Sequence, residues 1–306
     1  MNVEYVPYKN IDKRKWDNCI NDAVNSLLYA HSFYLDNMAA NWDALILNDY
    51  DAVMPLTWKK KWGTRYLYQP AFIQQGGIFF KKKLPEHQLQ SFIKEASTQF
   101  SFAEITLNFL NTEEELNSGF KIVLRDNYIL NLNLTYEALY ENYLPAFTKS
   151  LRRIKKFDFT YSISDDYTAH LKLYKNLYHS RLHYFSDRDF SQFKLICKKL
   201  HAENKLVIRF IKNTDEKLLA SVILLKDKKR LYNIISSITE DGKKLEANYF
   251  LYDRIIHEFS NTSFLLDFEG SDVKGIADFY KKINPENQPY PYIQFNNLPA
   301  IYKLFK

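Results

Sequence analysis

The sequence predicts an α+β protein with two similar domains, each a mixed, mostly antiparallel sheet flanked by helices. The main observation is that one order of elements occurs twice, in residues 42–107 and again in residues 206–268. Each copy reads as three consecutive strands joined by turns, then a helix, then a fourth strand. The copies share negligible sequence identity, so the repeat is one of order and spacing. We therefore expect domains at residues 1–134 and 135–306.

In the first half, hydrophobic periodicity and turn residues locate the elements. Pro55 inside a strand predicts an edge position or a bulge. Segment 66–80 should bend or split, because a proline and a Gly-Gly pair interrupt it. The expected helices are 11–29, 31–41 and 85–100, and the expected strands are 42–47, 52–58, 66–80, 102–110 and two pieces within 122–134.

In the second half, helical spacing predominates before the repeated strands begin. The tail from residue 285 contains several prolines, so it should be extended or looped, with one short final strand. The expected helices are 135–142, 147–157, 167–181, 187–203, 245–260 and 272–283, and the expected strands are 159–164, three between 206 and 242, 264–268 and 292–295.

Composition indicates a bacterial cytoplasmic protein. Cys19 and Cys197 are far apart and lack metal-like or redox spacing, so neither a disulfide framework nor a metal site is expected. The charged N-terminal segment has no apolar core of a signal peptide, and no apolar run approaches the roughly 20 residues of a membrane span. Abundant Lys, Asn, Ile, Tyr and Phe are typical of an AT-rich bacterial genome.

The net charge is +6, and its distribution is uneven. Residues 149–156 read KSLRRIKK and place five cations in eight positions. A smaller cluster at 226–230 lies at a strand end, where lysines usually solvate a turn. Whether the larger cluster binds a ligand depends on the class of protein.

Segment 265–283, LLDFEGSDVKGIADFYKKI, resembles the "DF-x-G … G-x-x-x-F-K" stretch of FemAB-like peptidyltransferases, and is more similar still to the BioF2-like branch of the GNAT superfamily. The matching residues are Asp267, Phe268, Glu269, Gly270, Gly275, Phe279, Tyr280 and Lys281. The KSLRRIKK helix and the tail YPYIQFNNLP also resemble this family. The resemblance covers most of residues 42–299 and implies two tandem GNAT-like domains, in agreement with the repeat.

Such a fold would transfer an acyl group to an amine, which requires a base for the amine proton. Asp267 and Glu269 are the candidate catalytic residues, because they follow an apolar strand and a spacing of two directs both to one face. Paired carboxylates also tend to raise one pKa, which suits a base. The alternative interpretation is structural: the pair would hold the following turn or cap the next helix.

The basic helix is the second candidate. Arg152, Arg153 and Lys156 match phosphate chemistry, as in a nucleotide-linked substrate, a CoA phosphate or a tRNA backbone. The alternative is a solvated amphipathic helix with its apolar side chains buried. From the matched motif, Tyr280 and Lys281 are further candidate substrate-binding residues.

The resemblance also implies a donor site. Ser236, Ser237 and Asn248 flank the helix N-terminus that would face the donor's pyrophosphate in a GNAT fold. Acetyl-CoA users usually carry a Gln/Arg-x-x-Gly-x-Gly/Ala loop here, whereas this chain reads SSITEDGKKLEAN. FemAB-like enzymes use aminoacyl-tRNA and lack the usual CoA loop. In the first half, Gln69 and Gln75 would line an interdomain cleft or satisfy each other within a sheet.

His179 and His183 have i, i+4 spacing, but no third ligand fits, so a surface pair is expected rather than a metal site. We thus expect an enzyme, an N-acyltransferase that transfers an acetyl or aminoacyl group to an amine of a small molecule or cell-envelope precursor. The donor would be acetyl-CoA or aminoacyl-tRNA, and Asp267→Asn should abolish transfer without unfolding the protein. The alternatives are an acetyl-CoA-dependent GNAT with an atypical donor loop, or a non-catalytic module that binds nucleic acid or another ligand.

Overall fold

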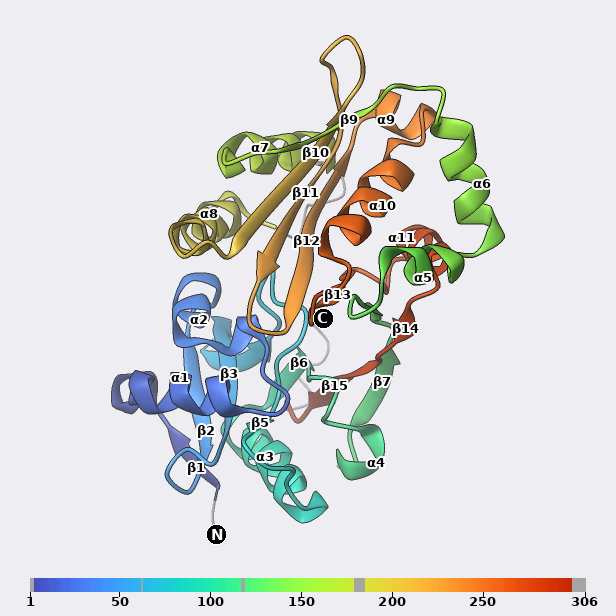
Figure 1. The fold of residues 1–306 in the computed structure, drawn as a ribbon. Helices are drawn as coiled ribbons and strands as arrows, with labels where there is room; N and C mark the ends of the chain where they lie inside the picture. Colours follow the sequence, from blue (N-terminus) through green and yellow to red (C-terminus); the bar gives the residue numbers. More distant parts are fainter. Residues whose placement is uncertain (1–2, 62, 117–118, 179–184, 299–306) are drawn as a thin grey trace. The chain divides into compact units, whose positions relative to one another are not determined.

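The computed structural model describes residues 3–61, 63–116, 119–178 and 185–298, and it divides into two compact units (Figure 1). The first unit runs to Asp126 and resumes at Pro289, and the second runs Asn127–Gln288. Each unit is a mixed sheet with flanking helices, so the predicted α+β class is confirmed. His179 and His183 lie outside the described residues.

The first unit is built on a sheet of order β1-β2-β3-β4-β6-β15-β7, with β5 paired to β3. Its strands are β1 Val3–Val6, β2 Trp42–Leu47, β3 Ala52–Lys61, β4 Thr64–Tyr68, β5 Phe79–Phe80, β6 Phe102–Thr106, β7 Lys121–Arg125 and β15 Tyr290–Asn296. Its helices are α1 Lys13–Asp22, α2 Ser32–Met38, α3 Glu86–Gln99 and α4 Glu113–Leu116. The apolar face of α3 packs on the sheet, with Phe92 fully buried.

The second unit is built on a sheet of order β14-β8-β13-β12-β11-β10-β9. Its strands are β8 Tyr128–Asn131, β9 Thr160–Ile163, β10 Leu206–Lys212, β11 Leu218–Lys226, β12 Arg230–Ile238, β13 Leu265–Asp267 and β14 Glu286–Asn287. Its helices are α5 Tyr136–Glu141, α6 Pro145–Ile154, α7 Tyr167–Tyr178, α8 Asp187–Ala202, α9 Glu240–Lys244, α10 Ala247–Phe259 and α11 Lys274–Tyr280. In Figure 1, α7 and α8 cover one face of this sheet and α10 covers the other.

The predicted repeat is confirmed in both units. In the first, β2, β3 and β4 form an antiparallel meander, α3 follows, and β6 pairs parallel to β4. In the second, β10, β11 and β12 form the meander, α9 and α10 follow, and β13 pairs parallel to β12. Two sequences without visible identity therefore build the same topology.

Two of the predicted helices have different bounds in the structure. The expected helix 11–29 ends at Asp22, and the Asn25 amide beyond it donates to Ile78 O at 2.8 Å. The expected helix 245–260 is preceded by a separate short helix, α9, and Glu246 with φ +55° lies between α9 and α10. Segment 66–80 splits into β4 and β5, as predicted.

The division into units also differs from the expected division at residue 134. β8 pairs with β13 and so lies in the second sheet. The C-terminal strand β15 pairs with β6 and β7 in the first sheet. Strand partners far apart in sequence set the division, and local patterns do not encode them.

Candidate active site

The sheet of the second unit opens where β12 and β13 part. The two strands pair in parallel only from Arg230 opposite Leu265 to Tyr232 opposite Asp267. β12 then continues to Ile238, still paired with β11 on its other side. The register between β11 and β12 shifts at this point, as a β-bulge does. Among the described residues, no strand pairs with the β13 side of positions 233–238.

A buried polar cluster lies at the start of this opening. The Asn233 side-chain amide donates to the hydroxyls of Tyr252 at 2.7 Å and Tyr280 at 2.8 Å, and to Phe268 O at 3.2 Å. The two tyrosine hydroxyls are 3.1 Å apart. Tyr252 also donates to Ser236 Oγ at 3.1 Å. The cluster therefore joins β12, α10, α11 and the chain that leaves β13.

The two phenols of this cluster are hydrogen-bond donors and not bases. Burial raises the pKa of Tyr280 well above its usual value, and the adjacent Tyr252 adds to the rise. Burial likewise raises the pKa of Tyr252. Both hydroxyls stay protonated at neutral pH, which suits them to stabilise a developing oxyanion.

Asp267 ends β13 and is almost completely buried, with 1% of its surface exposed. Its Oδ2 accepts from Arg230 Nη1 at 2.7 Å, and Arg230 is itself 4% exposed. Burial raises the pKa of Asp267, and the Arg230 guanidinium opposes that rise. The expectation that the 226–230 cluster only solvates a turn is wrong for Arg230, because its guanidinium is the buried partner of Asp267.

Glu269, the second candidate base, is half-buried and follows the end of β13. Its φ of +51° shows that the chain has left the extended conformation, so the alternation argument that put Glu269 and Asp267 on one face fails. The Glu269 N–H donates to Asp267 Oδ1 at 3.4 Å. The charge of Glu269 also acts on the nearby Tyr280 hydroxyl and contributes to its raised pKa.

The basic residues belong to α6 and the turn after it. Arg153 forms a two-pronged ion pair with Glu246, donating through Nε at 2.7 Å and through Nη2. Arg152 is exposed at the C-terminal end of α6. Lys156 is exposed, and its Nζ lies 5.0 Å from the centre of the Phe157 ring. One of the three candidate cations is therefore engaged within the unit.

The expected donor loop contains α9 rather than a long helix. Thr239 caps α9, accepting from Gly242 N at 3.0 Å through Oγ1. The first turn of α9 carries Glu240 and Asp241, which disfavour an anion there. Asn248 is half-buried in the first turn of α10. Ser237 points to the face opposite Ser236, and its buried hydroxyl has no hydrogen-bond partner among the described residues.

The candidate glutamines of the first unit have mainly structural contacts. Gln69 Oε1 accepts from Thr106 N at 3.0 Å, and Gln69 Nε2 donates to Ile73 O at 2.7 Å. This side chain closes the point where β4 and β6 part, which corresponds to the open point in the second unit. Gln75 is buried and accepts from Phe109 N at 3.1 Å.

Sequence reasoning missed Asn233, Tyr252 and Arg230. A lone amide in the apolar strand RLYNIISSI was a visible signal for Asn233. Tyr252 looks like any core residue of α10. Lys281, a candidate from the motif, lies with Nζ 5.6 Å from the centre of the Tyr128 ring. Across the described residues, no group of three or more His, Cys, Asp or Glu side chains is arranged to hold a metal ion.

A family model matches most of the second unit. Residues 142–282 match the family model described as an acetyltransferase (GNAT) domain. The solved structure of FemX is 14% identical, covers 99% of both chains and superposes with a TM-score of 0.66. No curated protein sequence matches the chain.

Two further solved structures share the fold. The C-terminal domain of a putative lysylphosphatidylglycerol synthetase from Agrobacterium fabrum is 12% identical over 96% of this chain and 95% of that one, with a TM-score of 0.59. L-PGS from Bacillus licheniformis is 11% identical over 96% and 94%, with a TM-score of 0.54.

Residues 142–282 thus match a GNAT domain, and the whole chain has a fold similar to that of FemX. The match to the GNAT model agrees with the resemblance to that superfamily expected from the sequence. None of the helices in the described part of the chain is long and apolar enough to cross a membrane.

Proposed function

We propose that the second unit transfers an acyl group to an amine, with the donor lying along the edge of β12 that β13 leaves. The observation that carries this proposal is the parting of the two strands after Tyr232 and Asp267. A free strand edge offers backbone N–H and C=O groups that hold an extended chain as another strand would. The corresponding point in the first unit is closed by Gln69, so we assign the reaction to the second unit.

In the proposed step, the amine nitrogen attacks the acyl carbonyl carbon. A C–N bond forms, and the bond from that carbon to the donor's oxygen or sulfur breaks. Glu269 takes the amine proton, directly or through water, and the proton finally reaches the leaving atom, so the donor departs as an alcohol or thiol. Tyr280 donates a hydrogen bond to the oxyanion of the intermediate. Asp267 is a positioning residue, since it holds Arg230 and accepts from the Glu269 amide.

As donor we propose an aminoacyl-tRNA. Exposed cations on and after α6, among them Arg152 and Lys156, support a phosphate backbone as the bound group. The carboxylates of Glu240 and Asp241 weigh against a pyrophosphate at α9. The lysyl group in the name of one structural neighbour is an aminoacyl group, in keeping with this donor. As acceptor we propose an amine of a cell-envelope precursor or small molecule.

Acetyl-CoA is the second candidate donor, because the matched family model is described as an acetyltransferase. Filter binding of charged and deacylated tRNA at several salt concentrations, beside calorimetric titration with acetyl-CoA and free CoA, separates the two. Saturable, salt-dependent binding that is tighter for charged tRNA supports the first donor. Micromolar binding of acetyl-CoA without binding of tRNA would make acetyl-CoA the donor instead.

A further inference from the structure

The second unit contains another concave site, formed by residues other than those proposed for acyl transfer. A pocket of about 600 Å³ opens between α5, α6, the turn after α6, and α10. Aromatic rings from these elements line it: Tyr136, Tyr140, Phe157, Phe159 and Phe250. All five are half-buried, so each is fixed in the unit and still presents part of its ring to the pocket.

The rings support one another. Phe157 and Phe159 are stacked with centres 5.6 Å apart, and Phe159 lies 5.7 Å from Phe250 on α10. Tyr136 and Tyr140, one turn apart on α5, are 5.9 Å apart. A concave wall of rings presents several negative π faces to one space.

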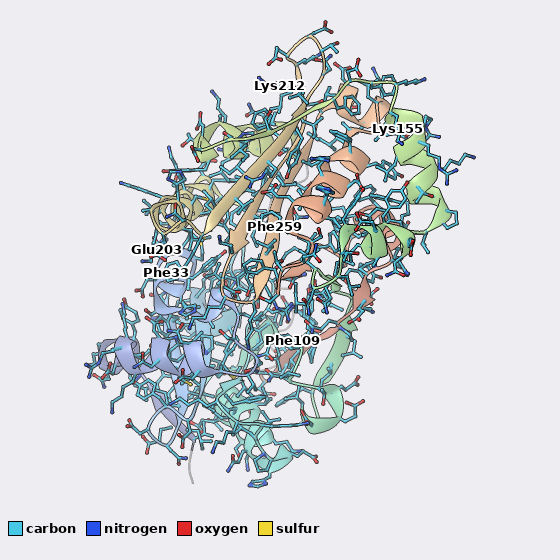
Figure 2. The ribbon with its side chains drawn as sticks, in the orientation of Figure 1. Phe33, Phe109, Lys155, Glu203, Lys212 and Phe259 are labelled. Atoms are coloured by element: carbon cyan, nitrogen blue, oxygen red, sulfur yellow. The ribbon has the colours of Figure 1, made fainter. Side chains whose placement is uncertain are left out.

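The charges that line the pocket are mostly negative. Asp253 of α10 is 9% exposed and accepts from the Tyr136 hydroxyl at 2.9 Å. Three exposed carboxylates join it: Glu137, Glu141 and Asp158. Lys155, labelled at the end of α6 in Figure 2, is the cation among the lining residues.

Two further cations lie near the pocket without being among its lining residues. Arg153 is paired with Glu246, and Lys156 Nζ lies 5.0 Å from the centre of Phe157, one of the lining rings. The lining residues thus carry four carboxylates against one ammonium, in a chain whose net charge is +6. Both the sign of the lining charges and the aromatic wall favour a positively charged ligand.

We propose that this pocket binds an organic ammonium group, either a free alkylamine or a lysine side chain of a peptide. Aromatic faces attract such a cation, and the carboxylates around them balance its positive charge. A bare metal ion fits less well, because half of the wall is hydrocarbon where oxygen ligands would be needed. The proposal does not depend on the acyl-transfer site.

The test compares choline with 3,3-dimethyl-1-butanol, its neutral carbon analogue, by calorimetric titration of the full chain. The decisive variant is Phe250→Leu, which keeps an apolar side chain but removes a ring. We expect choline to bind more tightly than the neutral analogue, and Phe250→Leu to weaken choline binding about fivefold to tenfold while changing the analogue little. Equal binding of the two probes, or choline binding that Phe250→Leu leaves unchanged, overturns the proposal.

A second variant tests the proposal if Phe250→Leu does not fold. Glu141→Gln with Asp158→Asn changes only exposed carboxylates of the lining, and Glu113→Gln with Glu114→Gln in α4 of the first unit is the matched control. The pocket variant should weaken choline binding at low salt, and the control should not; equal effects of the two contradict the proposal. Tighter binding of Nα-acetyllysine amide than of butylamine assigns the site to peptide lysines, and the reverse assigns it to free amines.

Discussion

Arg230 donates to Asp267 across the parallel pair of β12 and β13 at 2.7 Å, and both side chains are almost completely buried. The second arm of the guanidinium donates to Gln288 Oε1 at 2.7 Å, and Gln288 N donates to Asn127 O. The pair therefore fixes the two strands at the point from which they part.

Asp267→Asn should destabilise the second unit by about 3–5 kcal/mol, because it leaves the Arg230 charge buried without its counter-ion. This replaces the expectation from sequence that the substitution spares the fold. Urea unfolding of wild type and variant measures the change. A free energy of unfolding within about 0.5 kcal/mol of wild type would contradict a buried ion pair, since harmless surface changes lie in that range.

Tyr280→Phe should lower the rate of transfer by about 10²–10³, the usual cost of removing one oxyanion donor. Stability should fall by only about 1 kcal/mol, because Asn233 keeps its bonds to Tyr252 and Phe268. Steady-state kinetics and thermal unfolding separate the two effects. Tyr174→Phe on α7 is the matched control, and equal rates for both variants would rule out a catalytic hydroxyl at Tyr280.

Gly242→Ala should destabilise the protein by about 2 kcal/mol or more, because a Cβ there would lie 2.1 Å from Leu219 O. Gly242 thus allows α9 to pack against β11. The control is Gly275→Ala in α11, where a Cβ meets nothing within 4 Å and should change stability by less than about 1 kcal/mol. Similar unfolding midpoints for the two variants would show that α9 can shift freely.

The carboxylate of Glu258 links stability to pH. Burial tends to raise its pKa, but hydrogen bonds from Arg209 and Tyr161 outweigh burial and lower the pKa. Its contribution is therefore fully present above the unfolded value of about 4.3 and is lost as pH falls through the lower folded value. Glu258→Gln should cost most stability near pH 7, and its difference from wild type should shrink at acid pH. A difference that stays constant from pH 7 to pH 3 would be inconsistent with this linkage.

Arg152→Ala with Lys156→Ala should weaken tRNA binding and reduce its salt slope by about 2, because each removed cation leaves one phosphate without its neutralising charge. Filter binding across a salt series measures the slope. Lys228→Ala with Lys229→Ala removes the same charge from another exposed segment of the second unit and is the control. If both pairs lower the slope equally, the basic helix has no special role in donor binding.

The order of the elements could be predicted because alternating apolar residues, helical spacing and turn residues are local signals. The strands of both meanders and the helices after them lie close to where the sequence placed them. The position of β15 could not be predicted this way, since its partners β6 and β7 are far away in sequence. Strand pairing over such distances depends on packing and not on local pattern.

The candidate site could be predicted only in part, because its residues also come from positions far apart in the sequence. The segment around Asp267 was found from its motif, but Arg230 looked like one more cation of a solvated turn. Only the fold brings Arg230 and Asp267, separated by 37 positions, together. Tyr252 was invisible because a buried tyrosine on an apolar helix face reads as core until its hydroxyl partners are known.

In the proposed reaction, the second unit moves an acyl group from a donor to an amine. The most direct test incubates the protein with tRNA charged with radiolabelled amino acids, or with labelled acetyl-CoA, and an extract of cell-envelope precursors and small amines. Alkali destroys the aminoacyl ester and the thioester but spares an amide. We expect alkali-stable label that requires the protein and is largely lost with Glu269→Gln. The absence of alkali-stable label with both donors would contradict the account.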